Sequence, residues 1–211
     1  MKVKKSVIVA IAAVLAITCC AVDLSYADSQ PTDQLKDTID KIVTLLKNEE
    51  LKKPKNKKER RTEIAAIISQ RFDFEEMAKR SLAVHWNDRS PQEQKEFVAI
   101  FSTLLQQSYI GKIEAYTNET IVYDKNDVRG NTVSVYTTIK SPNVDIPIVY
   151  RMQPEGDKWW VYDVVIEGVS LVNTYRNQFN QIIRKESYTA LLDRLKKKLK
   201  EIEAEDKVSD S

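Results

Sequence analysis

The chain of 211 residues weighs 24.3 kDa, and 42% of its residues are hydrophobic while 30% are charged. This apolar share is enough for one well-formed core, and the low counts of Gly (4) and Pro (6) exclude a collagen-like or low-complexity chain. Beyond the first 27 residues the chain carries equal numbers of basic and acidic residues, so a general polyanion-binding protein is disfavoured.

The first 27 residues have the order of a secretory signal peptide. Lys2, Lys4 and Lys5 form a basic start, residues 7–20 are almost all apolar, and Ser25-Tyr26-Ala27 offers a cleavage site. Because the apolar run is short for a membrane span, we expect cleavage after this segment, with an uncleaved anchor as the alternative. Export predicts a periplasmic protein and disfavours nucleic acid as a partner.

Both cysteines of the chain, Cys19 and Cys20, lie inside this segment. Thr18 and Ala16 stand where a lipoprotein signal prefers a small residue and Leu, so the match to such a signal is poor. After cleavage the protein has no cysteine, and therefore no disulfide, thiol nucleophile or thiolate metal site. An exported chain of this size must then be stabilised by its hydrophobic core.

Apolar residues at helical spacing predict helices in the first half of the mature chain, beginning with residues 31–51. The basic run KKPKNKKERR at 52–61 is interpreted as a solvated linker leading into a helix, with contact to anionic lipid or an acidic partner as the alternative. Asp73 is a suitable cap for a short helix. The sequence Ser90-Pro91-Gln92-Glu93 predicts a capping box that starts a helix over about 91–110.

From Thr120 the apolar period changes to two, which predicts an antiparallel meander of four strands. The last strand, WWVYDVVI, is apolar on both faces and must be covered on both sides or line a cavity. Helical spacing then resumes. The expected strands are 120–127, 132–140, 145–152 and 158–166, within a single domain over 28–204 that is followed by a frayed tail at 205–211.

Few residues suggest catalysis. His85 is the only histidine, and without cysteine it cannot complete the usual zinc sites, so we expect it to be structural. The sequence has no nucleophile elbow and no Gly-rich phosphate loop. Asp163 lies in the most apolar strand, where a buried carboxylate needs a partner such as Arg151 or Arg176. We interpret it as a hydrogen-bond hub, with acid–base catalysis as the alternative.

Two segments resemble the MlaC family, also called the toluene-tolerance family: FDFEEMAKRSLAVHWNDRSPQEQKEFVAIFSTLLQQSY at 72–109 and WWVYDVVIEGVSLVNTYRNQF at 159–179. The most specific part is the EGVSLV–YR–QF pattern that begins at Glu167. The order of elements is similar along nearly the whole mature chain. Ala83 is a departure, because many relatives have Gly there, and we expect it to affect packing rather than function.

The resemblance implies a periplasmic phospholipid carrier with an α+β fold related to the nuclear-transport-factor-like fold. In such a fold, N-terminal helices, a four-stranded curved antiparallel sheet and C-terminal helices enclose an apolar lipid cavity. The implied ligand is a glycerophospholipid. The implied partners are an outer-membrane lipoprotein–porin complex and an inner-membrane ABC lipid transporter with a hexameric lipid-binding subunit, between which lipid is shuttled for outer-membrane asymmetry. Neither an enzyme activity, a cofactor nor a metal is implied.

We predict that the acyl chains lie between the sheet and the helix that follows Ser90. Alternation identifies two faces of a sheet but not the concave one, so the choice of strand face is a hypothesis. An exported interaction module with a solid core and a hydrolase that uses Asp163 remain as alternatives. The predicted wall consists of Phe97, Phe101, Leu104, Leu105, Tyr109, Val133, Val135, Ile146, Ile148, Tyr150, Val164 and Ile166.

Overall fold

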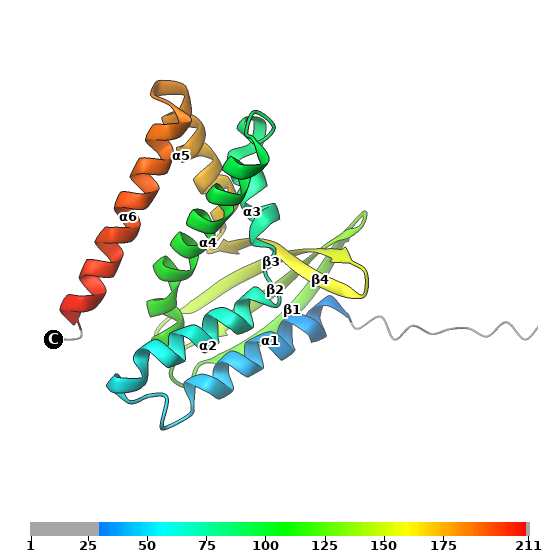
Figure 1. Ribbon diagram of the computed structural model, residues 1–211. Coiled ribbons are helices and arrows are strands. Elements are labelled where there is room, and N and C mark those ends of the chain that lie inside the picture. The colour runs from blue at the N-terminus through cyan, green and yellow to red at the C-terminus, as the bar shows by residue number, and fades with distance from the viewer. Residues whose placement is uncertain (1–29, 210–211) are drawn as a thin grey trace, which may run out of the picture.

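The computed structural model describes residues 30–209 and shows helices packed around one antiparallel sheet (Figure 1). The predicted signal peptide at 1–27 lies outside these residues. The helices are α1 (Pro31–Leu46), α2 (Lys57–Ser69), α3 (Phe74–Leu82), α4 (Pro91–Glu114), α5 (Leu171–Lys185) and α6 (Tyr188–Ser209), with 3₁₀ turns η1 (Pro54–Asn56) and η2 (Ala83–His85). The strands are β1 (Thr120–Arg129), β2 (Thr132–Lys140), β3 (Asp145–Glu155), β4 (Lys158–Ile166) and β5 (Val169–Ser170).

The predicted α+β meander is confirmed, because the strands pair antiparallel in chain order. β2 and β4 have the predicted bounds, while β1 and β3 run slightly longer. The additional strand, β5, has only two residues and therefore too little alternation to detect in a sequence. It pairs with the end of β4 and leads the chain into α5. Helix α6 continues to Ser209, past the boundary expected at residue 204.

The predicted helix starts are confirmed by their side-chain caps. Ser90 Oγ accepts a hydrogen bond from the backbone N–H of Glu93 at 3.3 Å, and the Glu93 carboxylate accepts one from the N–H of Ser90 at 2.8 Å. The Asp73 carboxylate accepts one from the N–H of Glu76 at 2.8 Å. These bonds satisfy N–H groups that have no partner inside a helix, so the starts of α3 and α4 are fixed locally.

Helices cover both faces of β4, as its doubly apolar sequence predicts. On one face, Leu35 of α1 packs in a cluster with Val161 and Val164. On the other face, the carboxylate of Asp163 meets the start of α5 and accepts a hydrogen bond from the N–H of Val172 at 3.1 Å. Figure 1 shows α1 and α2 side by side across the sheet, while α3, α4, α5 and α6 form a separate helical part.

The two edges of the sheet differ in how their backbone groups are protected from pairing with another strand. The second half of β1 is rich in charged residues, with the sequence YDKNDVR, and its pairing register shifts between Tyr123 and Lys125. At the opposite side, the segment before α3 runs along β4. Val161 donates its N–H to the carbonyl of Arg71, and its own carbonyl accepts the N–H of Asp73, both at 2.9 Å. One edge is therefore charged and kinked, and the other is partly covered.

The helical part has a filled aromatic core. The side chains of Phe97 and Phe101 are 0% exposed and that of Phe179 is 2% exposed. The ring of Phe179 meets those of Phe97 and Phe101 edge-on at centroid distances of 5.7 and 5.4 Å. Tyr175 meets Phe101 in the same manner at 5.0 Å. Edge-to-face rings at these distances pack favourably, so this cluster supports α3, α4, α5 and α6 together.

The basic run at 52–61 differs from the expected solvated linker. Its second half forms the first turns of α2, where Arg60 and Arg61 each make an ion pair with Glu114 of α4, at 2.6 and 2.8 Å respectively. The Glu114 side chain is only 12% exposed, so these pairs lie between the helices rather than in solvent. Charge density alone does not indicate which cations of a run have a buried partner.

Ala83 has an unusual backbone conformation. It follows α3 with φ +49°, a conformation that favours glycine, and its N–H donates to the carbonyl of Lys79. A residue with a side chain therefore strains the backbone at this position, and the expectation that Ala83 affects packing rather than function stays a prediction.

Candidate functional site

An apolar cavity of about 420 Å³ lies between the sheet and the helices. Its volume falls within the range of about 300–1,000 Å³ that is typical of ligand pockets. The sheet wall is formed by Ile121, Ile139, Ile146, Ile148, Tyr150, Val164 and Ile166. The helical walls are formed chiefly by Leu35, Ile39, Ile42, Val43 and Leu46 of α1, Ile68 of α2, and Leu105, Tyr109, Ile110 and Ile113 of α4.

The wall follows from simple periodicity in each element. On α1, Leu35, Ile39, Ile42 and Leu46 recur every three or four residues, so they share the face that lies over the sheet. On β3, Ile146, Ile148 and Tyr150 alternate and therefore point to one side. The side chains that α1 and the sheet present to this space are mainly branched aliphatic ones, and a cavity remains between the two layers.

Seven of the predicted wall residues line this cavity. They come from the second half of α4 and from β3 and β4. The chosen strand face is the one that α1 covers. The seven are Leu105, Tyr109, Ile146, Ile148, Tyr150, Val164 and Ile166.

The structure places the other five predicted residues elsewhere. Phe97, Phe101 and Leu104 belong to the filled helical core, because the first half of α4 packs against α3, α5 and α6 rather than the sheet. Val133 and Val135 lie on the cavity side of β2, but near the end of the sheet where Leu35 packs directly against the strands. These five do not line the cavity.

The prediction missed the contribution of α1 and α2. The apolar spacing of residues 31–51 predicts a helix, yet nothing in that spacing shows which part of the protein the apolar face contacts. Phe72 and Phe74, which precede and begin α3, also line the cavity. The available signal is the regular apolar stripe on α1, which indicates one buried face but not a cavity beside it.

The polar groups around the cavity are few. Burial raises the pKa of Tyr150 to about 12 and also raises the pKa of Tyr109, because a phenolate would lose its hydration in these apolar surroundings. Lys112 and Glu167 line the cavity as exposed residues, and the ammonium of Lys112 lies 5.4 Å from the centre of the Tyr109 ring. Both tyrosines are therefore neutral at physiological pH, and the site can hold an apolar ligand.

Asp163 is a structural hub, as predicted. Its carboxylate is buried and accepts hydrogen bonds from Ser170 Oγ at 2.7 Å, Arg151 Nη1 at 3.0 Å and the N–H of Val172 at 3.1 Å. Of the two proposed partners, Arg151 is the one that binds it, since Arg176 donates to the backbone carbonyl of Arg80. Asp163 faces α5 on the side of the sheet opposite the cavity.

His85 makes a contact of 3.0 Å between its Nε2 and the Oδ1 of Asn180, a structural role that joins η2 to α5.

Within residues 30–209 no group of three His, Cys, Asp or Glu side chains is placed to hold a metal ion. No helix in that range combines the length and the apolar character needed to cross a membrane.

Comparison with known proteins agrees with this architecture. The family model described as MlaC protein matches residues 36–197. The chain belongs to the MlaC family. The "Intermembrane phospholipid transport system binding protein MlaC" of Haemophilus influenzae is 20% identical over 177 residues, covering 81% of this chain and 83% of the relative. "Toluene tolerance protein ttg2D" of Pseudomonas putida is 23% identical over 159 residues, covering 74% of each.

A solved structure shares the fold of this MlaC-family chain. The phospholipid-binding protein from Ralstonia solanacearum, solved in complex with a phospholipid, superposes with a TM-score of 0.74 at 22% identity. The match covers 82% of this chain and 98% of the other.

Proposed function

We propose that this protein is a periplasmic carrier that holds the acyl chains of a glycerophospholipid in the cavity between α1, α4 and the sheet. The observation that carries the proposal is a cavity whose walls are almost entirely apolar and which lies beside a filled hydrophobic core. A solved structural neighbour contains a phospholipid, and a relative is named as a phospholipid transport protein. Both support a lipid rather than a soluble metabolite as ligand.

The energetics of transfer explain why such a cavity is needed. Two acyl chains with roughly thirty methylenes lose on the order of 20 kcal/mol when exposed to water, at about 0.8 kcal/mol per methylene. A soluble carrier must replace most of this stabilisation with its own apolar surface. The chains must also leave again, and aliphatic walls without hydrogen-bonding groups allow them to slide out.

The acyl-chain site that we propose combines seven residues predicted from sequence with the face of α1. Leu105 and Tyr109 form its α4 side, and β3 and β4 supply the sheet side. Phe97, Phe101 and Leu104 are left out of the proposed site, because they pack in the helical core, and Val133 and Val135 are left out because they do not line the cavity.

We propose that a cleaved signal peptide delivers the protein to the periplasm, where it shuttles lipid between the outer and inner membranes and maintains outer-membrane asymmetry. The partners that we propose for this protein are an outer-membrane lipoprotein–porin complex and an inner-membrane ABC transporter with a hexameric lipid-binding subunit. The names of the relatives support intermembrane phospholipid transport.

The two alternatives fit the structure less well. An interaction module with a solid core does not account for the cavity. A hydrolase that uses Asp163 does not fit either, because this carboxylate is held by three hydrogen bonds on the far side of the sheet from the cavity.

The test is to purify the protein under native conditions and measure the molar ratio of bound phospholipid by mass spectrometry. Val43→Trp places a large side chain in the cavity wall, whereas Val128→Trp makes the same replacement at a position that is 67% exposed on β1. We expect lipid in the wild type and in Val128→Trp, and a severalfold lower ratio in folded Val43→Trp. An absence of lipid from the wild type, or equal ratios in the two variants, would contradict the proposal.

A further inference from the structure

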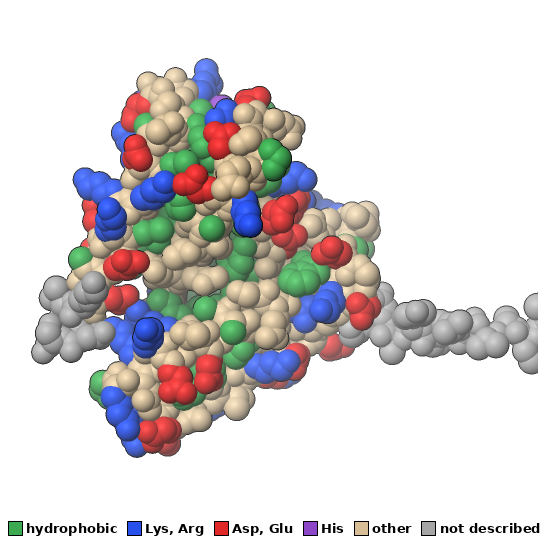
Figure 2. Space-filling view, in the orientation of Figure 1, with side chains coloured by type: hydrophobic (Ala, Val, Ile, Leu, Met, Phe, Trp, Pro, Cys, Tyr) green, Lys and Arg blue, Asp and Glu red, His purple; other side chains and the backbone are tan. Residues whose placement is uncertain are grey.

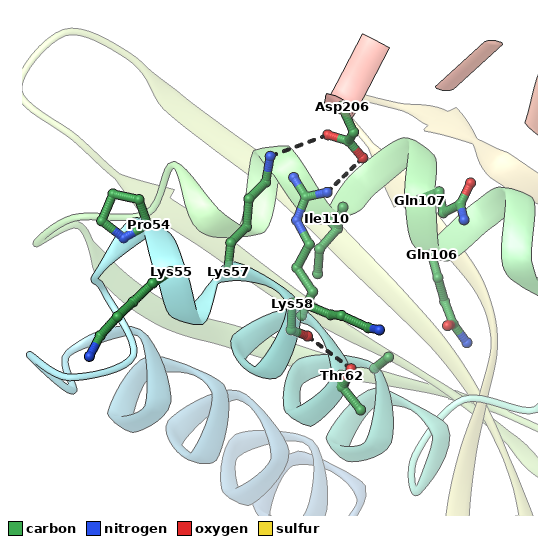
Figure 3. Close-up of a pocket in the computed structure, with 11 residues that line it drawn as sticks. Pro54, Lys55, Lys57, Lys58, Thr62, Gln106, Gln107, Ile110 and Asp206 are labelled. Atoms are coloured by element: carbon green, nitrogen blue, oxygen red, sulfur yellow. Dashed lines mark hydrogen bonds and ion pairs between the residues drawn. The ribbon is translucent and has the colours of Figure 1, made fainter. Parts of the chain in front are cut away.

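A second, polar pocket of about 460 Å³ lies where α2, α4 and the end of α6 approach one another. Figure 3 shows that α2 supplies Lys57 and Lys58, that α4 supplies Gln106, Gln107 and Ile110, and that Asp206 of α6 closes one side. In the space-filling view the surface is hollowed between the helical part and α2, with Lys and Arg side chains at the lower rim (Figure 2). The pocket is therefore open to solvent and rich in positive charge.

The polar pocket adjoins the apolar cavity. Ala65 of α2 and Gln106 and Ile110 of α4 line both spaces, so these side chains form the boundary between them. An amphiphile with an apolar and an anionic end matches this pair of neighbouring spaces. Neither space alone accommodates both ends, since one has almost no polar lining and the other carries charge.

The cations of the polar pocket differ in how they are neutralised. Asp206 makes ion pairs with Arg61 at 2.7 Å and with Lys57 at 3.7 Å. The side chains of these two cations are only 23% and 19% exposed, so both are held between the helices. The ammonium of Lys58, by contrast, makes no ion pair among the described residues, and Figure 3 shows its side chain extending along the pocket.

Two further polar groups of the pocket, Gln107 and Asp206, bear on what it can bind. The Oε1 atom of Gln107 is buried and has no hydrogen-bond partner among the described residues. A buried amide oxygen without a partner is costly, and a hydroxyl donor of a bound head group would satisfy it. The hydrogen bond from Arg61 lowers the pKa of Asp206, so this carboxylate is ionised at neutral pH and acts as an internal anion in the pocket.

We infer that this pocket binds the phosphate of the phospholipid head group and favours lipids with a net negative head. The inference rests on the proposed function, because it assigns a head-group site to the lipid whose chains fill the adjoining cavity. Lys58 attracts the phosphate, Lys57 and Arg61 contribute positive charge, and Asp206 competes with the ligand for these two cations. Removing a cation and removing Asp206 should therefore have opposite effects.

The experiment measures which lipid the protein extracts from vesicles of equimolar phosphatidylglycerol and phosphatidylethanolamine. Both lipids contain a phosphate diester, but only the first has a net negative head. We expect Lys58→Gln to lower the ratio of bound phosphatidylglycerol to phosphatidylethanolamine by roughly threefold, the size of effect of one exposed charge pair. Asp206→Asn should raise this ratio. Lys95→Gln, which removes an exposed cation from α4 outside the pocket, should leave the ratio unchanged.

The outcomes separate this inference from the proposed function. If the wild type extracts no lipid, the proposed function fails. If total uptake is normal but Lys58→Gln and Asp206→Asn keep the wild-type ratio, only the head-group site is wrong. Titration of inorganic phosphate distinguishes a head-group site from a free-phosphate site. Lipid-loaded protein should bind phosphate more weakly than lipid-free protein, and equal binding by both would overturn the assignment.

Discussion

The two halves of helix α4 bury their apolar side chains in different surroundings. Its first half carries Phe97 and Phe101 into a core where aromatic rings from α4 and α5 interlock. Its second half carries Leu105 and Tyr109 to the edge of a cavity of about 420 Å³. The same apolar periodicity continues through both halves. The comparison teaches that periodicity predicts which face is buried, but not whether the space beside it is filled.

The physical difference lies in the partners. In the helical part, Phe179 and Tyr175 of α5 insert edge-on against the rings of α4 and leave no room. In the sheet part, the facing side chains are mainly Ile and Val, which are short and stand in rows on a rigid sheet. The helical part therefore provides stability, and the sheet part can leave space for a ligand.

Truncating one aromatic ring in each half of α4 tests this division most strongly. Phe101→Ala removes a fully buried ring and should lower the free energy of unfolding by about 3–5 kcal/mol. Tyr109→Ala removes a ring that already borders a space, so it should lower this free energy by less than half as much. Urea unfolding monitored by circular dichroism gives both values.

Lipid content should follow the opposite order. The folded fraction of Phe101→Ala should retain the wild-type lipid ratio, whereas Tyr109→Ala should lose lipid. A loss of lipid confined to Phe101→Ala would reverse the roles assigned to the two regions.

Asp163→Asn tests the connection between the sheet and the helical part, because the Asp163 carboxylate on β4 accepts hydrogen bonds from the start of α5. Replacing a buried, charge-assisted acceptor should lower the free energy of unfolding by about 1.5–3 kcal/mol while lipid binding persists. Asp193→Asn, at an exposed position of α6, is the matched control and should change stability little. Unchanged stability in Asp163→Asn together with loss of an esterase activity would favour the hydrolase instead.

The smallest expected effect concerns Tyr150 on the cavity wall. Burial raises the pKa of its phenol to about 12, from about 10 in the unfolded chain. The free energy of unfolding should therefore be unaffected by this group below pH 10 and should fall as the pH rises from 10 to 12, because the unfolded chain loses the phenol proton first. At pH 11 the loss should be on the order of 1 kcal/mol larger in the wild type than in Tyr150→Phe. Denaturant unfolding at pH 8 and pH 11 measures the difference. Equal pH dependence in the two proteins would show that this phenol is hydrated.

Much of the fold was predictable because its signals are local. The capping box at Ser90 fixes the start of α4, the alternation in β2 and β4 fixes their bounds, and the doubly apolar β4 indicates cover on both faces. The lipid site was predictable only in part. Phe97 and Leu105 stand on the same apolar face of one helix, and their different surroundings depend on α5 and α1, which lie far away in the sequence.

The sequence could not show that Arg60 and Arg61 make partly buried ion pairs, because the contact depends on a residue that is distant in the chain. Their partner, Glu114, lies more than fifty residues away. The strain at Ala83 depends on a backbone angle that no composition or periodicity reports. Long-range pairing and local backbone geometry therefore mark the limit of what this sequence indicates.

The charged half of β1 has a consequence for the behaviour of the protein in solution. An open sheet with an unpaired outer strand can template the addition of a strand from a neighbouring molecule, the first step of ordered aggregation. The charges of YDKNDVR and the register shift after Tyr123 make that edge a poor template, and the segment from Arg71 to Asp73 shields part of the opposite edge. Both features disfavour strand addition at the edges of a sheet whose inner face borders an apolar cavity.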